Sequence, residues 1–453
     1  MTTDASAEIW SERREGWKPG KADARDSAAT DYGRIVHSAS FRRLQGKTQI
    51  LNLGDSDFYR NRLTHSIEVA QVAGGIARQL QQDFVDHPAA PWIPDVTLIQ
   101  AVGATHDLGH PPFGHGGEVA LHYSMRESGG FEGNGQTLRI LSRLESFSDR
   151  NGANLSRRSL LGILKYPAAM SAVRSRDEAL RPRLLGETSV VKLIDRKACR
   201  PPKCYLDTEV DVVDWLLDPV PKADRDLFTS WKPIDGDHGE TKHKTFDCSI
   251  MDLADDISFG VHDLEDALAM GLMGPDDIRS MIAEDACGSF LEYLQTRENF
   301  GNDVYAGFVR VLTGDQRTRK RNISRMVGHL ITSVRIGTIE EFETPLLRYR
   351  AELPEPQLRF LKALKTAVKM KVIRSASVQH LEFKGQNMVV AVFEALATAP
   401  KALLPESTRT RYEASNDPVR VICDHIAGMT DGFLLRTYER LFSPRMGSVF
   451  DQI

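Results

Sequence analysis

The chain carries Thr105-His106-Asp107-Leu108-Gly109-His110-Pro111-Pro112-Phe113-Gly114-His115-Gly116-Gly117-Glu118 directly after an apolar, helix-like run at 96–104. An adjacent His-Asp pair, His106-Asp107, offers one neutral nitrogen and one anionic oxygen, and this mix suits a divalent transition metal. A helix that ends at Leu108-Gly109 and is broken by Pro111-Pro112 would hold the pair in its last turn. The segment therefore predicts half of a metal site at the end of a helix.

The second part of this segment predicts a general acid. His115 and Glu118 are three residues apart, so they share a face if a new helix starts there. A carboxylate beside an imidazole fixes its orientation and favours its protonated form. A lone His-Asp pair usually holds no metal, but the surrounding glycines and prolines allow backbone to approach a ligand closely. We therefore favour a functional site over a solvent loop.

One stretch cannot complete a metal site, and His65 is the nearest further candidate. It begins an apolar helical stripe that continues through Val69, Val72, Ile76 and Leu80. A histidine in such a stripe is more often a satisfied core residue than a ligand. If this helix packs antiparallel to the one before His106, however, its start meets the other's end. Arg62, one turn earlier, is then a candidate phosphate clamp.

A second carboxylate is predicted on a helix at 250–268. Its apolar residues form one stripe, and Asp255, Phe259 and Asp263 follow at intervals of four. An acidic stripe is usually a solvated face, yet Asp255 stands among apolar neighbours and suits a ligand position. The expected metal set is completed in this way: His65, His106, Asp107 and Asp255.

The bulk composition is that of a globular protein without a basic signature. The 453 residues are 41% hydrophobic and 26% charged, with a formal net charge of −4. The five cysteines include no Cys-x-x-Cys pair, which favours a reducing, cytoplasmic compartment. No signal or membrane-spanning segment is apparent, so we expect no membrane partner.

Changes in composition divide the chain into three regions. Residues 1–30 are a polar N-terminal arm, 31–270 form the core with surface insertions near 168–205 and 226–246, and 271–453 are a C-terminal helical region packed on the core. We expect the N-terminal arm to be ordered only where it docks.

These pieces together resemble the HD superfamily of metal-dependent phosphohydrolases, and more narrowly its deoxyguanosine triphosphate triphosphohydrolase-like family. The resemblance covers about residues 30–445. The matching text is Phe41-Arg42-Arg43-Leu44-Gln45, Lys47-Thr48-Gln49, Arg62-Leu63-Thr64-His65-Ser66, His106-Asp107-Leu108-Gly109, Pro111-Pro112-Phe113-Gly114-His115, Phe131-Glu132-Gly133-Asn134, Ala254-Asp255-Asp256-Ile257-Ser258 and Ile426-Ala427-Gly428-Met429-Thr430-Asp431.

The resemblance implies an all-α fold, a large helical bundle with the metal site at its centre and at most a short β-hairpin near residues 47–60. It places His65, His106, Asp107 and Asp255 at the metal. The roles that it implies for other residues are these: His115 and Glu118 as the catalytic pair, Gln49 against the deoxynucleoside, Arg62, Lys165 and Lys203 near the phosphates, and Asp263 near the sugar 3′-hydroxyl. Phe259 departs from the tyrosine that is common in relatives, which affects sugar discrimination.

The activity that the resemblance implies is metal-dependent hydrolysis of a deoxynucleoside triphosphate, dGTP in the first instance, to deoxynucleoside and inorganic triphosphate. One divalent metal per subunit is expected, Mn²⁺ or Mg²⁺, although this ligand set also admits Fe, Co, Ni or Zn. A homo-oligomer, a hexamer by resemblance, and single-stranded DNA or a nucleotide as effector are the implied partners. Two alternatives stay open: another HD-type nucleotidase or phosphodiesterase, and a catalytically silent nucleotide-sensing or single-stranded-DNA-binding protein.

Overall fold

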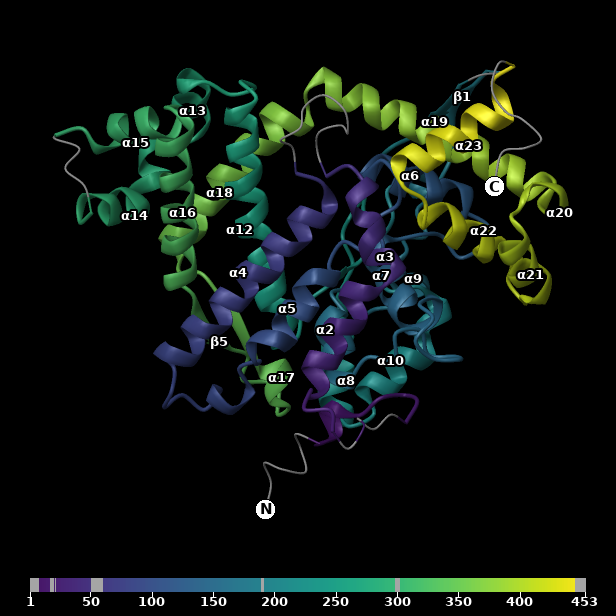
Figure 1. The fold of residues 1–453 in the computed structure, drawn as a ribbon, viewed down its shortest axis with the longest axis horizontal. Coiled ribbons are helices and arrows are strands. Elements are labelled where there is room, and N and C mark those ends of the chain that lie inside the picture. The colour runs from purple at the N-terminus through teal and green to yellow at the C-terminus, as the bar shows by residue number, and fades with distance from the viewer. Residues whose placement is uncertain are drawn as a thin grey trace.

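The computed structural model describes residues 8–16, 20, 22–49, 60–188, 191–297 and 302–444. Helices build most of this part of the chain (Figure 1), which confirms the predicted all-α class. At the predicted hairpin, Thr48 and Asn61 form an isolated antiparallel bridge, and residues 50–59 lie outside the described part. Across the described ranges, no helix is both long and apolar enough to span a bilayer.

The α-helices are α2 (Ser27–His37), α3 (Ala39–Arg43), α4 (Arg62–Asp83), α5 (Val96–Thr105), α6 (Gly114–Ser124), α7 (Gly133–Arg139), α8 (Arg157–Ile163), α9 (Met170–Val173), α10 (Val210–Leu217), α11 (Lys222–Phe228), α12 (Phe246–Ala269), α13 (Pro275–Met281), α14 (Glu284–Gln295), α15 (Val304–Leu312), α16 (Gln316–Thr332), α17 (Pro345–Arg348), α18 (Glu355–Val368), α19 (Ala376–Thr398), α20 (Pro400–Leu403), α21 (Glu406–Ala414), α22 (Pro418–Ala427) and α23 (Asp431–Phe442). Three antiparallel pairs join β1 (Leu184–Glu187) to β2 (Lys192–Ile194), β3 (Trp231–Lys232) to β4 (Glu240–Thr241), and β5 (Arg335–Thr338) to β6 (Tyr349–Glu352).

Helices α4 and α5 pack antiparallel, which is the condition under which the sequence places His65 beside His106. A Cβ added at Gly103 would lie 2.9 Å from the Cα of Ala70, so only glycine permits this approach. Gly74, further along α4, faces Gln100, which is earlier in α5. The reversed order brings the start of α4 to the end of α5, and the ring centroids of His65 and His106 lie 5.2 Å apart.

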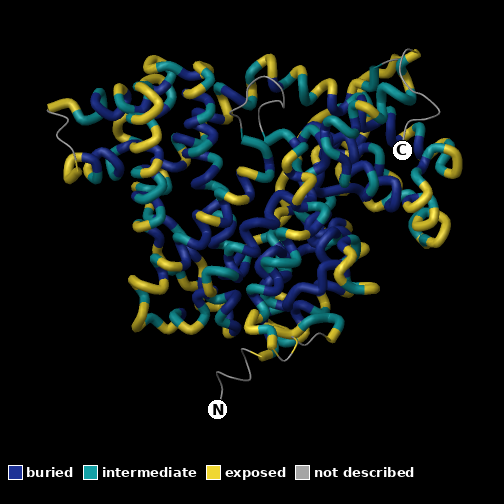
Figure 2. Tube along the Cα trace, viewed as in Figure 1, coloured by how far each residue is buried: buried dark blue, intermediate teal, exposed yellow. Residues whose placement is uncertain are grey.

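Helix α12 is the central support of these two helices. Thr245 caps it by accepting a hydrogen bond from the Cys248 amide. Its predicted apolar stripe is buried, apart from the partly buried Leu253. It packs against α4, α5, α16 and α18, and Figure 2 shows buried residues concentrated where these helices cross. The helix therefore carries its acidic residues into the middle of the bundle.

A second apolar cluster joins the C-terminal helices to α6. Helix α19 runs along the top of the bundle in Figure 1 and packs on α6, α22 and α23. Buried members of this cluster include Leu121, Phe131, Val389, Phe393, Ile426 and Leu434. The C-terminal region therefore lies against the helix that follows the His-Asp segment.

The described part of the N-terminal arm is tied to the core by a buried ion pair. Asp31 is fully buried and accepts hydrogen bonds from Arg13 at 2.5 Å and from the hydroxyls of Ser156 and Ser159 at 2.6 and 2.7 Å. The Arg13 side chain is 3% exposed. Trp10 from the same arm is buried in the main core.

Replacing Asp31 with alanine is expected to destabilise the protein by about 3–5 kcal/mol, because the buried Arg13 charge loses its carboxylate partner. The measurement is the unfolding midpoint in urea and by heat. Asp23→Ala is the matched control, since Asp23 pairs with the exposed Arg25 and its loss should leave both midpoints close to those of the wild type. Equal midpoints for the two variants would contradict a role for the Asp31 ion pair.

Candidate active site

The structure brings the four predicted metal-ligand side chains together from three elements. His65 lies in the first turns of α4, His106 and Asp107 follow α5, and Asp255 lies on α12. His65 Nε2 is 3.2 Å from Asp255 Oδ1, and His106 Nε2 is 3.5 Å from Asp107 Oδ2 and 3.8 Å from Asp255 Oδ1. Donor atoms of His65, His106 and Asp107 all lie within 4.8 Å of one another.

The His-Asp pair lies just beyond α5 and not in its last turn. The helix ends at Thr105, and His106 is the C-cap. The prediction placed the end at Leu108-Gly109, but residues 106–109 form turns in place of a last helical turn. The change of backbone direction lets both neighbouring side chains reach the same centre.

The protonation of His106 fits a metal ligand. Its Nδ1 lies 2.8 Å from the carbonyl oxygen of Gly103, which can only accept, so Nδ1 carries the proton. The lone pair is then on Nε2, which is buried and has no hydrogen-bond partner among the described residues. An imidazole held in this way through its other nitrogen is the usual arrangement at protein metal sites. The orphaned nitrogen and two adjacent carboxylates form a donor set for a divalent cation.

Both carboxylates of the cluster stay anionic. Burial alone would raise the pKa of Asp107, but Arg62 and the neighbouring imidazoles hold that pKa well below its usual range. Arg62 donates to Asp107 at 2.6 Å, and His110 Nδ1 lies 3.0 Å from the other carboxylate oxygen. Burial likewise opposes ionisation of Asp255, yet hydrogen bonding to His65 lowers its pKa. Two negative charges are thus available at neutral pH.

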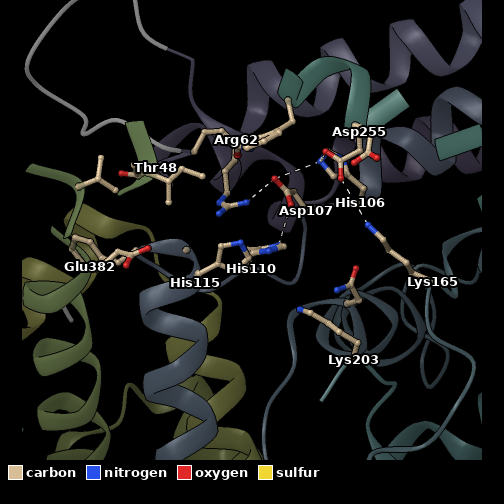
Figure 3. A pocket seen from close by; sticks show the side chains of 18 of the residues that line it. Thr48, Arg62, His106, Asp107, His110, His115, Lys165, Lys203, Asp255 and Glu382 are labelled. Atoms are coloured by element: carbon tan, nitrogen blue, oxygen red, sulfur yellow. Dashed lines mark hydrogen bonds and ion pairs between the residues drawn. The ribbon is translucent and has the colours of Figure 1, made fainter. Parts of the chain in front are cut away.

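A cavity of about 300 Å³ opens beside this cluster. Figure 3 shows Lys165 and Lys203 on one side of the His106-Asp107 pair, and Thr48 and Glu382 on the other. The cavity is lined by predicted site residues from widely separated parts of the chain: Gln49, Arg62, His106, Asp107, His115, Lys165, Lys203, Asp255 and Phe259.

His115 and Glu118 form the predicted pair in the first turn of α6. His115 Nδ1 is 3.1 Å from Glu118 Oε2, while the imidazole is 66% exposed and faces the cavity. The turn before the helix is left-handed, with φ of 60° at Phe113 and 55° at Gly114. A phenylalanine rarely adopts this conformation, so the surrounding contacts must hold the turn that presents His115.

Glu118 is buried and anchored by other groups besides His115. Its Oε1 accepts a hydrogen bond from the Gly133 amide at 3.0 Å and lies 3.5 Å from Lys203 Nζ. Burial alone would raise the pKa of Glu118, but Lys203 and the hydrogen bond to His115 hold it well below its usual range. The carboxylate is therefore fixed in place and negative, as an orienting partner of His115 requires.

Two lysine ammonium groups lie on one side of the cavity, each beside carboxylates. Lys165 Nζ lies 2.7 Å from Asp252 Oδ1 and 3.8 Å from Asp255 Oδ2. Burial lowers the pKa of Lys165, but these carboxylates raise it well above its usual value. Lys203 comes from the segment 168–205, which the sequence marks as a surface insertion, and binds Glu132 at 3.0 Å. This segment thus contributes directly to the cavity.

The remaining predicted residues divide between the wall and the interior. Gln49 lines the cavity, and its Oε1 is buried without a hydrogen-bond partner in the described structure. Phe259 also lines the wall. Asp263 is 5% exposed and is not among the residues that line the cavity. Burial raises the pKa of Asp263 to about 7.

Several wall residues were missed by the sequence analysis. His110 belongs to the quoted segment but received no role, although its ring centroid lies 5.6 Å from that of His115. The third histidine of that segment was the available signal. The others come from a region without a motif: Ile373, Val378, Leu381 and Glu382, at the start of α19 and just before it.

Comparisons with known proteins show the family of this chain. The HD domain family matches residues 62–196, and the phosphohydrolase-associated domain family matches residues 351–440. The deoxyguanosinetriphosphate triphosphohydrolase-like protein of Shewanella halifaxensis is 43% identical over 450 residues, covering 98% of each chain. Deoxyguanosinetriphosphate triphosphohydrolase-like protein 2 of Deinococcus radiodurans is 41% identical over 444 residues, again covering 98% of each. This chain therefore belongs to the deoxyguanosine triphosphate triphosphohydrolase-like family of HD-domain phosphohydrolases.

Proposed function

We propose that the protein hydrolyses deoxynucleoside triphosphates, dGTP foremost, to the deoxynucleoside and inorganic triphosphate. The observation that carries this proposal is the convergence of three groups on one cavity. These are the His-His-Asp-Asp cluster, the side of the cavity with Lys165 and Lys203, and the His115–Glu118 pair. Cleavage of the bond between the α-phosphorus and the 5′-oxygen can use each of them: a metal site, cations for the phosphates and a proton donor for the leaving oxygen.

The arrangement of the wall orients the substrate. Phosphates are drawn to the side with Lys165 and Lys203, and Arg62 offers a forked donor beside Asp107. The nucleoside then lies toward Thr48 and Glu382, on the opposite side. The scissile bond between the α-phosphorus and the 5′-oxygen falls between them, next to the cluster.

The chemistry divides between the cation and the protein. A divalent cation at the four-residue cluster supplies Lewis acidity for water activation and for charge on the phosphoryl oxygens. His65, His106, Asp107 and Asp255 would hold it. His115 gives its proton to the departing 5′-oxygen on the nucleoside side, and Glu118 holds the ring through Nδ1. Arg62 and the lysines neutralise the triphosphate that leaves on the other side.

Guanine is the proposed base because the buried Gln49 oxygen on the cavity wall has no hydrogen-bond partner among the described residues. Guanine presents N–H donors on its Watson–Crick edge, from which this oxygen can accept. The printed names of the two relatives above also refer to deoxyguanosine triphosphate.

The deciding experiment incubates the purified protein with manganese and each of the four deoxynucleoside triphosphates, and measures inorganic triphosphate. Release of triphosphate, fastest from dGTP, supports the proposal. Release of only phosphate or pyrophosphate would indicate another HD-type nucleotide hydrolase. No release from any of them would indicate a sensing or binding protein.

Gln49→Ala is expected to raise the KM for the preferred nucleotide about tenfold with a smaller change in kcat, because the lost amide acts on the nucleoside and not on the reacting bond. Gln45→Ala is the matched control, since Gln45 is an exposed amide outside the cavity wall. Steady-state kinetics of triphosphate release measure both. An unchanged KM in Gln49→Ala would remove Gln49 from substrate recognition.

The finer properties follow from the family resemblance and from the donor set. We propose Mn²⁺ or Mg²⁺ as the native metal, a homo-oligomer such as a hexamer as the working form, and nucleotide or single-stranded DNA as effector. The five cysteines are all free and buried, which fits a cytoplasmic location.

A further inference from the structure

The Ile426–Asp431 motif, for which the sequence suggested no role, contacts two separate active-site loops through one carboxylate. Asp431 is 5% exposed and lies at the start of α23. Its Oδ2 accepts hydrogen bonds from the amide and hydroxyl of Thr48 at 2.9 and 2.5 Å. Its Oδ1 accepts from the amide of Phe113 at 3.0 Å. The carboxylate therefore joins the residue before Gln49 to the left-handed turn before His115.

A second contact reinforces this junction. Lys47 is 2% exposed, and its ammonium donates to the carbonyl oxygens of His110 at 2.6 Å and Ala427 at 2.9 Å. A Cβ on Gly46 would lie 2.8 Å from the Thr430 side chain, so the segment 46–48 packs closely on the α22–α23 junction. The same two loops are thus tied to the C-terminal region by two independent polar contacts.

The turn at Phe113 needs such support. Its φ of 60° is unfavourable for a phenylalanine, so the conformation persists only where the surrounding structure holds it. The Phe113 ring fills the space over Gly385 of α19, where a Cβ would lie 2.4 Å from the ring. Asp431 fixes the backbone of this residue, and α19 fixes its ring. His115 follows two residues later, so its direction depends on this turn.

We propose that Asp431 is a positioning residue that aligns the nucleoside contact at Gln49 and the proton donor at His115 at the same time. The inference rests on the proposed function for the roles of those two residues. A single carboxylate that holds both loops fixes the position of the nucleoside relative to the His115 imidazole. A displacement of a reacting group by about 1 Å can lower the rate about 100-fold.

Asp431→Asn tests the proposal with little change in volume. An amide can accept from only one of the two loops and turns a donor toward the other, so one loop loses its anchor. We expect kcat to fall by about 10- to 100-fold and KM to rise as well, with metal content and melting temperature close to wild type. Asp417→Asn is the matched control, because Asp417 caps α22 through the Arg420 amide and is not part of the cavity wall. It should leave both constants unchanged.

Thr48→Val removes only the hydroxyl donor and keeps the amide contact. It should raise KM and leave kcat unchanged, while binding of a deoxynucleoside triphosphate analogue with a methylene group in place of the 5′-oxygen weakens in parallel. Wild-type constants in Asp431→Asn, or losses matched by Asp417→Asn, would overturn the inference. Failure of the proposed function is a separate outcome, because wild-type protein would then release no triphosphate, and the 5′-methylene analogue would still report whether Asp431 shapes the nucleotide site.

Discussion

Replacing His115 with alanine is expected to lower kcat by about 10²–10⁴-fold, the usual contribution of a positioned general acid. The 5′-oxygen leaves as an alkoxide unless a proton reaches it, and His115 is the exposed imidazole on the nucleoside side of the cavity. Because the side chain is 66% exposed and its neighbours are the Glu118 carboxylate and the His110 ring, its removal should not disturb folding. Metal content and melting temperature should therefore equal those of the wild type.

His380→Ala is the matched control for this variant. His380 is exposed on α19 and is absent from the cavity wall, so its loss should leave kcat unchanged. Turnover is measured as triphosphate in quenched reactions, and the manganese content is measured on the same protein preparations. Full turnover in His115→Ala would remove His115 from proton transfer, and loss of metal in that variant would show that its role is structural.

The metal-ligand cluster could be predicted from the sequence because each member stands in a local pattern. The apolar period of α4 placed His65 at the start of a buried stripe, and the proline break after His106-Asp107 placed that pair at a helix end. Antiparallel packing then needed only the small residues that face each other at Gly103 and Ala70. The interior of α12 was predictable for the same reason, since helical spacing and burial coincide there.

Helical spacing puts Asp263 on one line of α12 with Asp255 and Phe259, while its expected place near the sugar 3′-hydroxyl came from the family resemblance. Residues four apart advance by more than one turn, so each step drifts by roughly 40° and rises by about 6 Å. Phe259 is one such step from Asp255 and stays on the wall, whereas Asp263 is two steps away and is buried elsewhere. Spacing in the sequence does not show how far the side-chain position has rotated around the helix axis after two turns.

The C-terminal contribution to the site could not be read from the sequence. The cavity-lining residues between Ile373 and Glu382 lie in helical sequence without a recognisable motif. The hydrogen bond from Lys47 to Ala427 joins residues that are 380 positions apart. Such contacts depend on how α19 and α22 pack on α6, which no local pattern encodes. The Ile426–Asp431 motif was recognisable by resemblance, but its contacts with Thr48 and Phe113 required the folded chain.

Asp255→Ala is expected to abolish metal binding and, with it, all turnover. The variant keeps His65, His106 and Asp107 but loses one of the two negative charges that balance a divalent cation. Removing a group that merely orients a ligand already weakens metal binding about 10- to 100-fold, so loss of a ligand should exceed 100-fold. Added Mn²⁺ is expected to raise the melting temperature of the wild type, and this rise should be absent in Asp255→Ala.

Asp256→Ala separates this effect from a general loss of acid on α12. Asp256 is the next residue, but its carboxylate pairs with Lys365 and not with the two histidines. The Asp256→Ala variant should therefore retain metal at the wild-type level, as measured by elemental analysis and by calorimetric titration with Mn²⁺. Full metal occupancy in Asp255→Ala together with loss in Asp256→Ala would mean that the neighbouring aspartate is the ligand. Since His65 Nε2 lies 3.2 Å from Asp255, we expect the opposite order.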